Sequence, residues 1–207
     1  MRQPPRSIAI RRLRFPALFL AAALCLVHAL TPLFPPLRAE KTAKEKADAP
    51  NGSVEILRDF SLLPPEVDRM RRAILTAAMS GNIEAMRVPV EMNEIPPIVA
   101  REKVADPIGY WRKISGDGEG REILAILIQL FRTGFVKKRI ATGEDLYIWP
   151  YFAELPMAKL SPAQEVELLT LISPQRLNLM RASGRYDHYR LGITQNGIWH
   201  FFHDQVY

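Results

Sequence analysis

Apolar residues recur at helical spacing in two stretches of the chain. In residues 65–81 they follow one another after three or four positions, at Val67, Met70, Ile74 and Ala77. This is the period of a helix with one buried face, and the prolines before the stretch and Gly81 at its end are start and stop signals. The second stretch, residues 119–131, is apolar over most of its circumference. We expect two helices here, the second at the buried centre of the domain.

Prolines and capping residues predict shorter helices elsewhere. Residues 106–114 begin with Asp-Pro and residues 161–173 with Ser-Pro, and both pairs favour a helix N-terminus. Glu165 is placed to close a capping box, and Pro174 starts a further helical segment. Residues 94–106 are punctuated by prolines, so we expect irregular structure there.

The hydrophobic period changes after Gly134. Residues 135–152 are rich in β-branched and aromatic residues on both sides of a turn at residues 141–145. This pattern predicts two strands. Pro150 lies inside the second one, which indicates either an edge strand or a bend at that point.

A C-terminal hairpin is predicted around Gln195, Asn196 and Gly197, which suit a type I turn with Gly197 in the left-handed conformation. If these three residues form the loop, one side carries the pairs Ile193–Trp199, Leu191–Phe201 and Tyr189–His203. The other side then carries His188 near Asp204 and Arg190 near Phe202. We expect Trp199 and Phe201 to pack on the helix of residues 119–131. The fold class is therefore α+β, with a helical N-terminal half packed on a small antiparallel sheet that ends in this hairpin.

The segment before the apolar helix reads SGDGEG, residues 115–120, and invites comparison with ion and phosphate loops. A helix-loop-helix calcium site that began at Asp117 would need an acid at its twelfth position, where the chain has Ile128. A phosphate loop would be repelled by its three acids, Asp117, Glu119 and Glu122. The segment is better interpreted as a helix start, in which Ser115 or Asp117 caps and the acids complement the helix dipole.

The N-terminus has the order of an export signal, which is basic, then apolar, then small. Arginines lie between residues 2 and 14, an apolar run covers residues 15–30, and Ala39 precedes Glu40. We predict a signal peptide over residues 1–39, a flexible linker over 40–60 and a single α+β domain over 61–207. The alternatives are cleavage after Ala29 and retention of the segment as a membrane anchor.

Removal of the signal changes the charge of the chain. Residues 1–39 hold six of the 28 basic residues and none of the 22 acidic ones, so the remainder has 22 of each. Net charge therefore gives no support for nucleic-acid binding. The only cysteine, Cys25, lies in the signal, so we expect no disulfide, thiolate zinc site or thiol nucleophile in the mature protein.

Titratable residues that could carry out chemistry are concentrated near the C-terminus. His188, His200 and His203 lie close to Asp187 and Asp204, a set that could bind a metal or transfer protons. In the hairpin register above, however, His203 points away from the other two histidines. We interpret all three as solvent-exposed or strand-end residues. We accordingly predict no metal site, no catalytic residue and no cofactor.

Two further polar features lie in the first strand pair. Glu154 stands beside aromatic residues, where it is either a buried carboxylate with a raised pKa or a strand-end residue that reaches solvent. The basic run Lys137, Lys138 and Arg139 allows a weaker hypothesis of binding to cell-wall or lipid phosphate. In a strand, successive side chains point to opposite faces, so Lys138 points away from the face that carries Lys137 and Arg139. This weakens the hypothesis of phosphate binding further.

Three segments resemble a group of exported proteobacterial α+β proteins that carries no assigned activity. They are DPIGYWRKISGDGEGREILAILIQL, YIWPYFAELPMAKLSPAQEVELLTLI and YRLGITQNGIWHFF, and the likeness covers roughly residues 62–203. The resemblance implies an exported α+β domain and supplies no catalytic residue.

These observations predict a periplasmic or secreted protein with a non-catalytic accessory or interaction role. The alternative is a small-molecule-binding or hydrolytic domain with a pocket between the sheet and the helices. Its candidate ligand-binding residues are Trp149, Tyr151, Glu154, His188 and Arg190, with Tyr189 and Trp199 as further lining residues. The expected partner is a protein or small molecule of the cell envelope rather than a nucleic acid, and the membrane only if the signal segment stays uncleaved.

Overall fold

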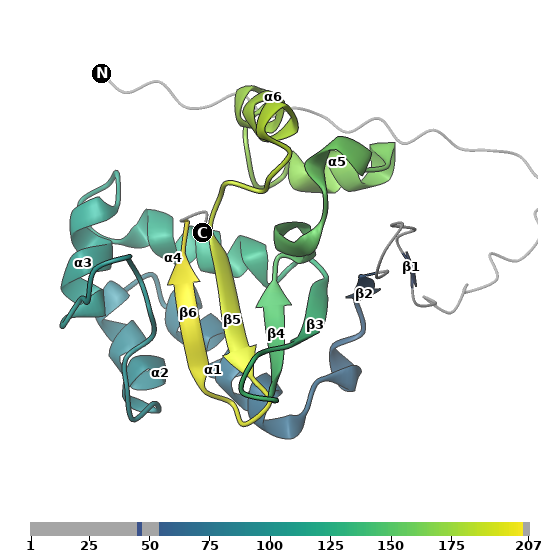
Figure 1. Ribbon diagram of the computed structural model, residues 1–207. Helices are drawn as coiled ribbons and strands as arrows, with labels where there is room; N and C mark the ends of the chain where they lie inside the picture. The colour runs from purple at the N-terminus through teal and green to yellow at the C-terminus, as the bar shows by residue number, and fades with distance from the viewer. Residues whose placement is uncertain (1–44, 47–53, 205–207) are drawn as a thin grey trace, which may run out of the picture. The chain divides into compact units, whose positions relative to one another are not determined.

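The computed structural model describes residues 45–46 and 54–204 and has an α+β fold (Figure 1). Its sheet is antiparallel, and the strands are adjacent in the order in which the chain makes them. They are β1 (Glu45–Lys46), β2 (Glu55–Leu57), β3 (Phe135–Arg139), β4 (Asp145–Trp149), β5 (Arg190–Thr194) and β6 (Trp199–His203). The predicted signal peptide lies outside the described residues.

Helices fill the first half of the described domain and return between β4 and β5. The α-helices are α1 (Pro65–Met79), α2 (Arg87–Glu91), α3 (Pro107–Ile114), α4 (Arg121–Leu130), α5 (Pro162–Leu168) and α6 (Pro174–Ser183). Single turns of 3-10 helix connect them, at η1 (Phe60–Leu62), η2 (Ile83–Met86), η3 (Tyr151–Glu154) and η4 (Met157–Lys159). The predicted fold class, with its helical first half and final hairpin, is confirmed.

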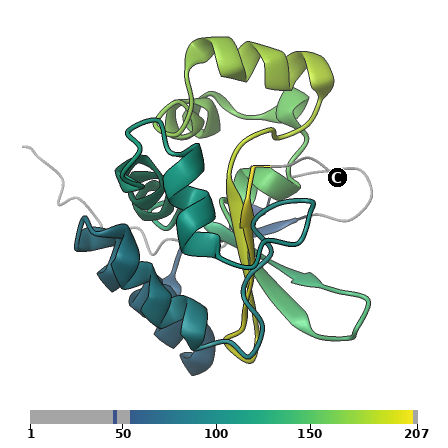
Figure 2. The ribbon, with the colours of Figure 1, turned by 90° about the vertical axis from the view of Figure 1, so that its left-hand side faces the viewer.

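Helices α1 and α4 cover one face of the strands, as the two views show (Figure 1, Figure 2). The predicted stripe of α1 is buried in this layer, and α4 buries Ile123, Leu124, Leu127 and Leu130. The strands contribute large rings to the same core, including Trp149, Trp199 and Phe202, each 0% exposed. Burial of so much apolar surface is the main stabilising contribution in a domain of this size.

The opposite face of the sheet has a core of its own. Ile56, Val136 and Ile148 point to this side of the strands and pack with residues of η3, η4, α5 and α6. α5 begins with the predicted Ser161 cap, but the capping box is closed by Gln164, the third residue of the helix, and not by Glu165. This second core lies toward the end of the sheet where η3, η4, α5 and α6 gather (Figure 1).

The segment before α4 is a helix start, as predicted. Carboxylate oxygens of Asp117 accept from the backbone N–H groups of Gly120 and Arg121, both at 3.1 Å, and from the Ser115 hydroxyl. Glu122 reaches back to the N–H of Gly116 at 2.5 Å. Both carboxylates thus bind backbone N–H groups at the N-terminal end of α4. Hydrogen bonding lowers the pKa of Asp117, and the Ser115 hydroxyl contributes most to this shift.

Two sequence-based boundaries are wrong. Residues 55–57, assigned to the linker, form strand β2, since Ile56 is 1% exposed and pairs with Val136 of β3. The strand expected to contain Pro150 ends one residue earlier, at Trp149, and the Trp149–Pro150 peptide bond is cis. β4 is an interior strand and not an edge strand, and the chain bends at Pro150, directly after the strand ends.

The register of the C-terminal hairpin differs from the expected one beyond its first pair. Gly197 is left-handed and Ile193 pairs with Trp199, as predicted. A bulge then inserts His200, so that Leu191 pairs with Phe202 and Arg190 with His203. One extra residue moves every later side chain to the opposite face. Trp199 packs on the helices as predicted, but Phe202 and not Phe201 accompanies it.

Candidate functional site

The two aromatic candidates belong to closed cores. Trp149 lies under α4, with its ring 5.2 Å from that of Phe131, and Tyr151 lies in the core on the other face; both are 0% exposed. Trp199 is likewise 0% exposed. A ligand between the sheet and the helices would have to displace these rings.

The hydroxyl of Tyr151 completes a polar network at the edge of the second core. It donates to Glu167 at 2.8 Å and accepts from Arg58 at 3.2 Å, while Arg58 binds both carboxylate oxygens of Glu167 at 2.8 and 3.0 Å. Burial, and then the hydrogen bond to Glu167, raise the pKa of Tyr151 far above its usual range. The network joins the segment after β2 to α5, which is a structural role.

Glu154 reaches solvent, as in the interpretation of this residue as a strand-end carboxylate rather than a buried one. Its carboxylate lies 2.8 Å from the ammonium group of Lys138, and its side chain is 21% exposed. Lys137 and Arg139 both pair with Asp145, at 3.6 and 3.0 Å. The basic run is therefore neutralised locally, which weakens the hypothesis of phosphate binding.

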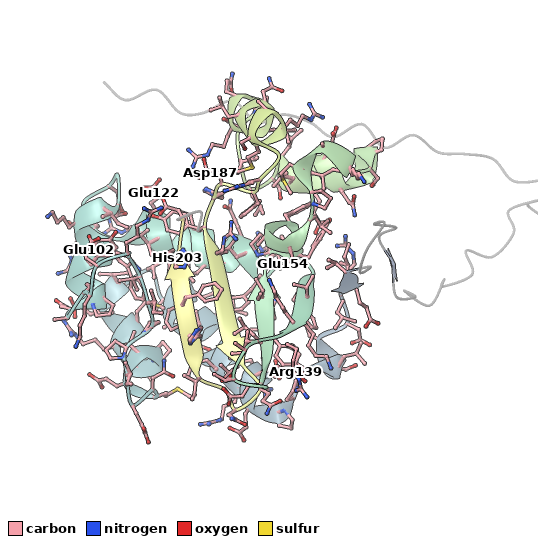
Figure 3. The ribbon with its side chains drawn as sticks, viewed as in Figure 1. Glu102, Glu122, Arg139, Glu154, Asp187 and His203 are labelled. Carbon is pink, nitrogen blue, oxygen red and sulfur yellow. The ribbon has the colours of Figure 1, made fainter. Side chains whose placement is uncertain are left out.

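Arg190 is the first residue of β5 and pairs with His203 of β6, and His188 precedes Arg190 by two residues. Figure 3 labels His203 on β6 and Asp187 in the segment that leads into β5. Burial lowers the pKa of both histidines to about 4, helped by Arg176 at His188 and by Arg190 at His203. His203 is a strand-end residue, since it is the last residue of β6, but it is not solvent-exposed: it is 3% exposed. The bulge at His200 places it on the face opposite Trp199, where its ring lies 5.1 Å from that of Phe201. His200 is exposed, as expected.

Two arginine side chains form hydrogen bonds with backbone carbonyls of the loop between α6 and β5. Arg190 donates to the carbonyl of Tyr186 at 2.7 Å, and Arg176 donates to the carbonyl of Asp187 at 2.9 Å. The Tyr186 hydroxyl closes the loop on the carbonyl of Tyr189. Among the described residues, no group of three or more His, Cys, Asp or Glu side chains is arranged to hold a metal ion.

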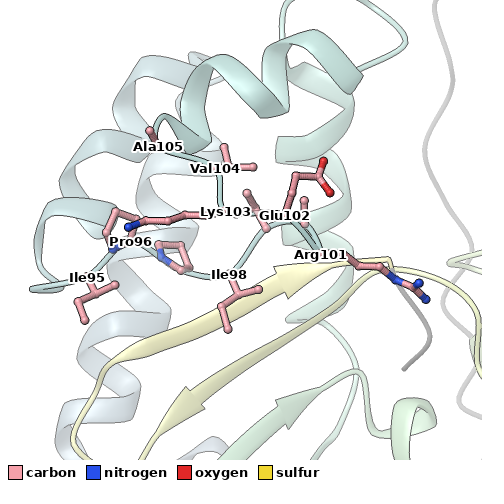
Figure 4. Close-up of a pocket in the computed structure, with 11 residues that line it drawn as sticks. Ile95, Pro96, Ile98, Arg101, Glu102, Lys103, Val104 and Ala105 are labelled. Atoms are coloured by element: carbon pink, nitrogen blue, oxygen red, sulfur yellow. The ribbon is translucent and has the colours of Figure 1, made fainter.

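The sequence did not predict a cavity of about 590 Å³ that is lined by residues 95–105 (Figure 4). We call residues 93–105 the edge loop. The side chains that line the cavity are mostly apolar, and Ile95 and Ile98 point to the same side of the loop, next to β6. Cavities that bind small molecules or anchor side chains fall within roughly 300–1,000 Å³.

The edge loop also occupies the outer edge of β6. The amide side chain of Asn93 binds both backbone groups of Trp199, accepting from its N–H at 3.1 Å and donating to its carbonyl at 2.9 Å. Ile98 forms a parallel bridge to β6, with N–H to the carbonyl of His200 at 3.0 Å and carbonyl to the N–H of Phe202 at 2.9 Å. This strand edge is thus satisfied from within the chain.

Large apolar side chains surround the loop and face solvent. Ile95 is 77% exposed and Ile98 47% exposed. Ile198 is also exposed, and it is the residue before Trp199, whose backbone forms hydrogen bonds with Asn93 of the edge loop. Two exposed residues on or just after α2 continue the set along the chain. We call these five residues the apolar rim: Val88, Met92, Ile95, Ile98 and Ile198.

The sequence contained one signal for this surface. Residues 94–106 combine prolines with apolar residues that follow no helical or strand period, so no buried face accounts for Ile95 and Ile98. Irregular loops with such residues at their surface commonly bind partners. The contact with β6 was not visible, because it is made by backbone groups and one amide side chain.

Comparisons with known proteins do not assign the chain. No family model, curated protein or solved structure matches it. Within residues 45–46 and 54–204, none of the helices is both long enough and apolar enough to span a membrane.

Proposed function

We propose that the chain is an exported periplasmic or secreted protein with a non-catalytic accessory role, and that it binds another protein through the edge loop and the apolar rim. The exposure of Ile95 and Ile98, which line the cavity of about 590 Å³, carries this proposal. Contiguous apolar surface on a soluble domain generally marks a site of interaction.

The five residues that the sequence offered as ligand-binding candidates also support a non-catalytic role, because the structure engages them in packing, ion pairs or loop contacts. Trp149 is enclosed, Tyr151 and Glu154 are engaged with charged partners, and Arg190 fastens a loop. Burial lowers the pKa of His188 to about 4, so it is neutral at pH 7, and the described residues hold no group of three or more His, Cys, Asp or Glu side chains arranged for a metal ion. A catalytic constellation needs a nucleophile, a base and an orienting group within mutual reach.

Export rests on the order of residues in the N-terminal segment, which is basic, then apolar, then small. Intact-mass measurement of the protein from the cell envelope should give a mature N-terminus at Glu40. An N-terminus at Leu30 would move the cleavage site, and one at Met1 would contradict export with cleavage.

Position-specific cross-linking in the cell tests the interaction surface. A photoreactive residue in place of Ile98 should form one discrete adduct with another protein of the cell envelope. The same residue in place of Leu179 is the control, since Leu179 is a 65% exposed apolar side chain on α6. Equal adducts at both positions, or none at Ile98, would contradict the proposal.

The alternative of a small-molecule-binding domain is supported by one observation, the size of the cavity. Native mass spectrometry of the protein purified from the envelope separates the two. A bound molecule of constant mass favours the alternative, and an apo protein that still gives the Ile98 adduct favours the accessory role.

A further inference from the structure

We propose that the loop between α6 and β5, residues 184–189, is an acid-sensitive switch, which opens when His188 and His203 take up protons while the rest of the sheet stays folded. Opening exposes Tyr186, which the closed loop places in the second core at 2% exposure. The switch involves neither the edge loop nor the apolar rim, so it is independent of the proposed function.

Two guanidinium groups and one phenol hold this loop closed. Arg176 donates to the carbonyl of Asp187 at 2.9 Å and lies 3.4 Å from its carboxylate. Arg190 donates to the carbonyl of Tyr186 at 2.7 Å, and the Tyr186 hydroxyl donates to the carbonyl of Tyr189 at 3.0 Å. The closed loop therefore has two positive charges at its carbonyl groups.

The two histidines lie beside these charges. His188 belongs to the loop and is half-buried, with its ring 6.5 Å from that of Tyr186 and 5.5 Å from that of Tyr189. His203 is 3% exposed and pairs with Arg190 across β5 and β6. A proton on either ring would be a buried positive charge near an arginine, and both burial and the like charge disfavour it.

Charged groups of both signs act on the two histidines: Arg176, Asp187, Glu122 and Asp204 on His188, and Arg190 and Asp204 on His203. The carboxylates favour protonation, but burial, helped by the arginines, outweighs them. The pKa of both histidines consequently falls from 6.5 to about 4. The tyrosines beside them stay neutral in this range, because burial raises their pKa.

Acid therefore favours the open loop. A histidine released to solvent titrates near 6.5, so below this pH the open loop binds protons that the closed loop excludes. The closed state is fully favoured above pH 6.5 and loses this advantage as the pH falls toward 4. Allowing for partial screening by solvent, we expect the equilibrium constant for opening to rise at least about tenfold between pH 7 and 4.5.

The loop is built to open by itself. Residues 184–189 lie outside the helices and strands, and side chains bind the carbonyls of residues 186, 187 and 189. β3 and β4, by contrast, pair along four residues and contain no histidine. Segments without a backbone ladder open at a lower free energy than the strands of a sheet.

Hydrogen exchange of the mature chain at pH 7 and 4.5, corrected for the intrinsic effect of pH on exchange, measures the opening. Protection of residues 186–192 should fall at least about tenfold at pH 4.5 and should stay below that of β3 and β4. Low concentrations of urea distinguish local from global opening, because the urea dependence of exchange scales with the surface exposed. Residues 186–192 should respond weakly to urea, and β3 and β4 strongly.

Variants assign the acid effect to the histidines. His188→Gln with His203→Gln should reduce the change in protection of residues 186–192 between the two pH values to less than about twofold. His200→Gln is the matched control, since His200 is an exposed histidine of the same strand. It should respond to acid as the parent protein does.

Three results would overturn the switch. Residues 186–192 that match β3 and β4 in protection and in urea dependence would open only when the whole domain unfolds. An acid effect that persists in the double variant would belong to carboxylates. If the double variant does not fold, NMR titration of the imidazole protons of the parent protein decides: both histidines should have a pKa of about 4, and a pKa near 6.5 for either contradicts the switch.

Discussion

Strand β6 takes part in two groups of apolar residues that differ in what surrounds them. On its helix-covered face, Trp199 stacks on Trp111 with ring centroids 5.5 Å apart, and both are 0% exposed. At its outer edge, Ile98 is held by backbone hydrogen bonds and leaves its side chain 47% exposed. The first group accounts for much of the stability of the fold, whereas the second adds little to it and is the surface through which we propose that a partner binds.

The largest effect should come from the first group. Trp199→Ala removes a fully buried ring that contacts both Trp111 and Phe202, and such truncations cost about 3–5 kcal/mol. The variant should be unfolded or nearly so by circular dichroism and urea titration. Trp199→Phe keeps a ring in place and should cost much less. A stably folded Trp199→Ala protein would show that this core is not the source of stability.

A pair of glycines before α4 tests how tightly the helix layer is packed. Both Gly118 and Gly120 have positive φ, but a Cβ at Gly120 would lie 2.7 Å from Ile83, whereas a Cβ at Gly118 meets nothing within 4 Å. Backbone strain costs about 1 kcal/mol or more at either position. Overpacking adds about 1–3 kcal/mol at Gly120 alone. Gly120→Ala should therefore unfold at lower urea than Gly118→Ala, and equal midpoints would contradict the contact.

Acid should weaken the end of the sheet where the half-buried His188 and the buried His203 lie. Their pKa values of about 4 are below the ordinary 6.5, so between these values the unfolded chain binds more protons than the folded one. The stabilisation is complete above pH 6.5 and is lost as pH falls toward 4. It amounts to roughly 1–3 kcal/mol, since both sites are partly screened by solvent. Urea titrations at pH 7 and 4.5 measure it.

A double variant distinguishes the contribution of the two histidines to the pH dependence of stability from that of the carboxylates. His188→Gln with His203→Gln should reduce the loss of stability between pH 7 and 4.5. Asp117, whose pKa is lowered, contributes to acid sensitivity mainly at lower pH. An unchanged pH dependence in the double variant would show that neither histidine is kept neutral by the fold.

The parts of the fold that were predicted depend on local patterns. The stripe of α1, the start of α4 and the turn at Gly197 are each specified by residues a few positions apart. The bulge at His200 was missed because the contacts that accompany it, from the backbone of Ile98 and the side chain of Asn93, come from a segment about one hundred residues away. Only tertiary structure reveals which of the predicted side chains face inward after it.

The candidate site shows the same division. The sequence supplied five residues with suitable chemistry, but the packing of Trp149 and the partners of Tyr151 and Glu154 are long-range contacts. The edge loop was expected to be irregular, and residues 95–105 lie outside the helices and strands of the fold. Its exposed apolar side chains could not be predicted, because exposure is decided by the elements that surround a loop and not by the loop itself.

The comparison between the two apolar groups is tested most directly by the free energy of unfolding of Ile95→Ser with Ile98→Ser. Both side chains are largely outside the core, and the strand bridge uses only the backbone of Ile98. We predict a urea-derived change below about 1 kcal/mol, as for surface substitutions. A loss of about 3 kcal/mol or more, similar to that of Trp199→Ala, would mean that the rim supports the fold and would remove the reason for a partner.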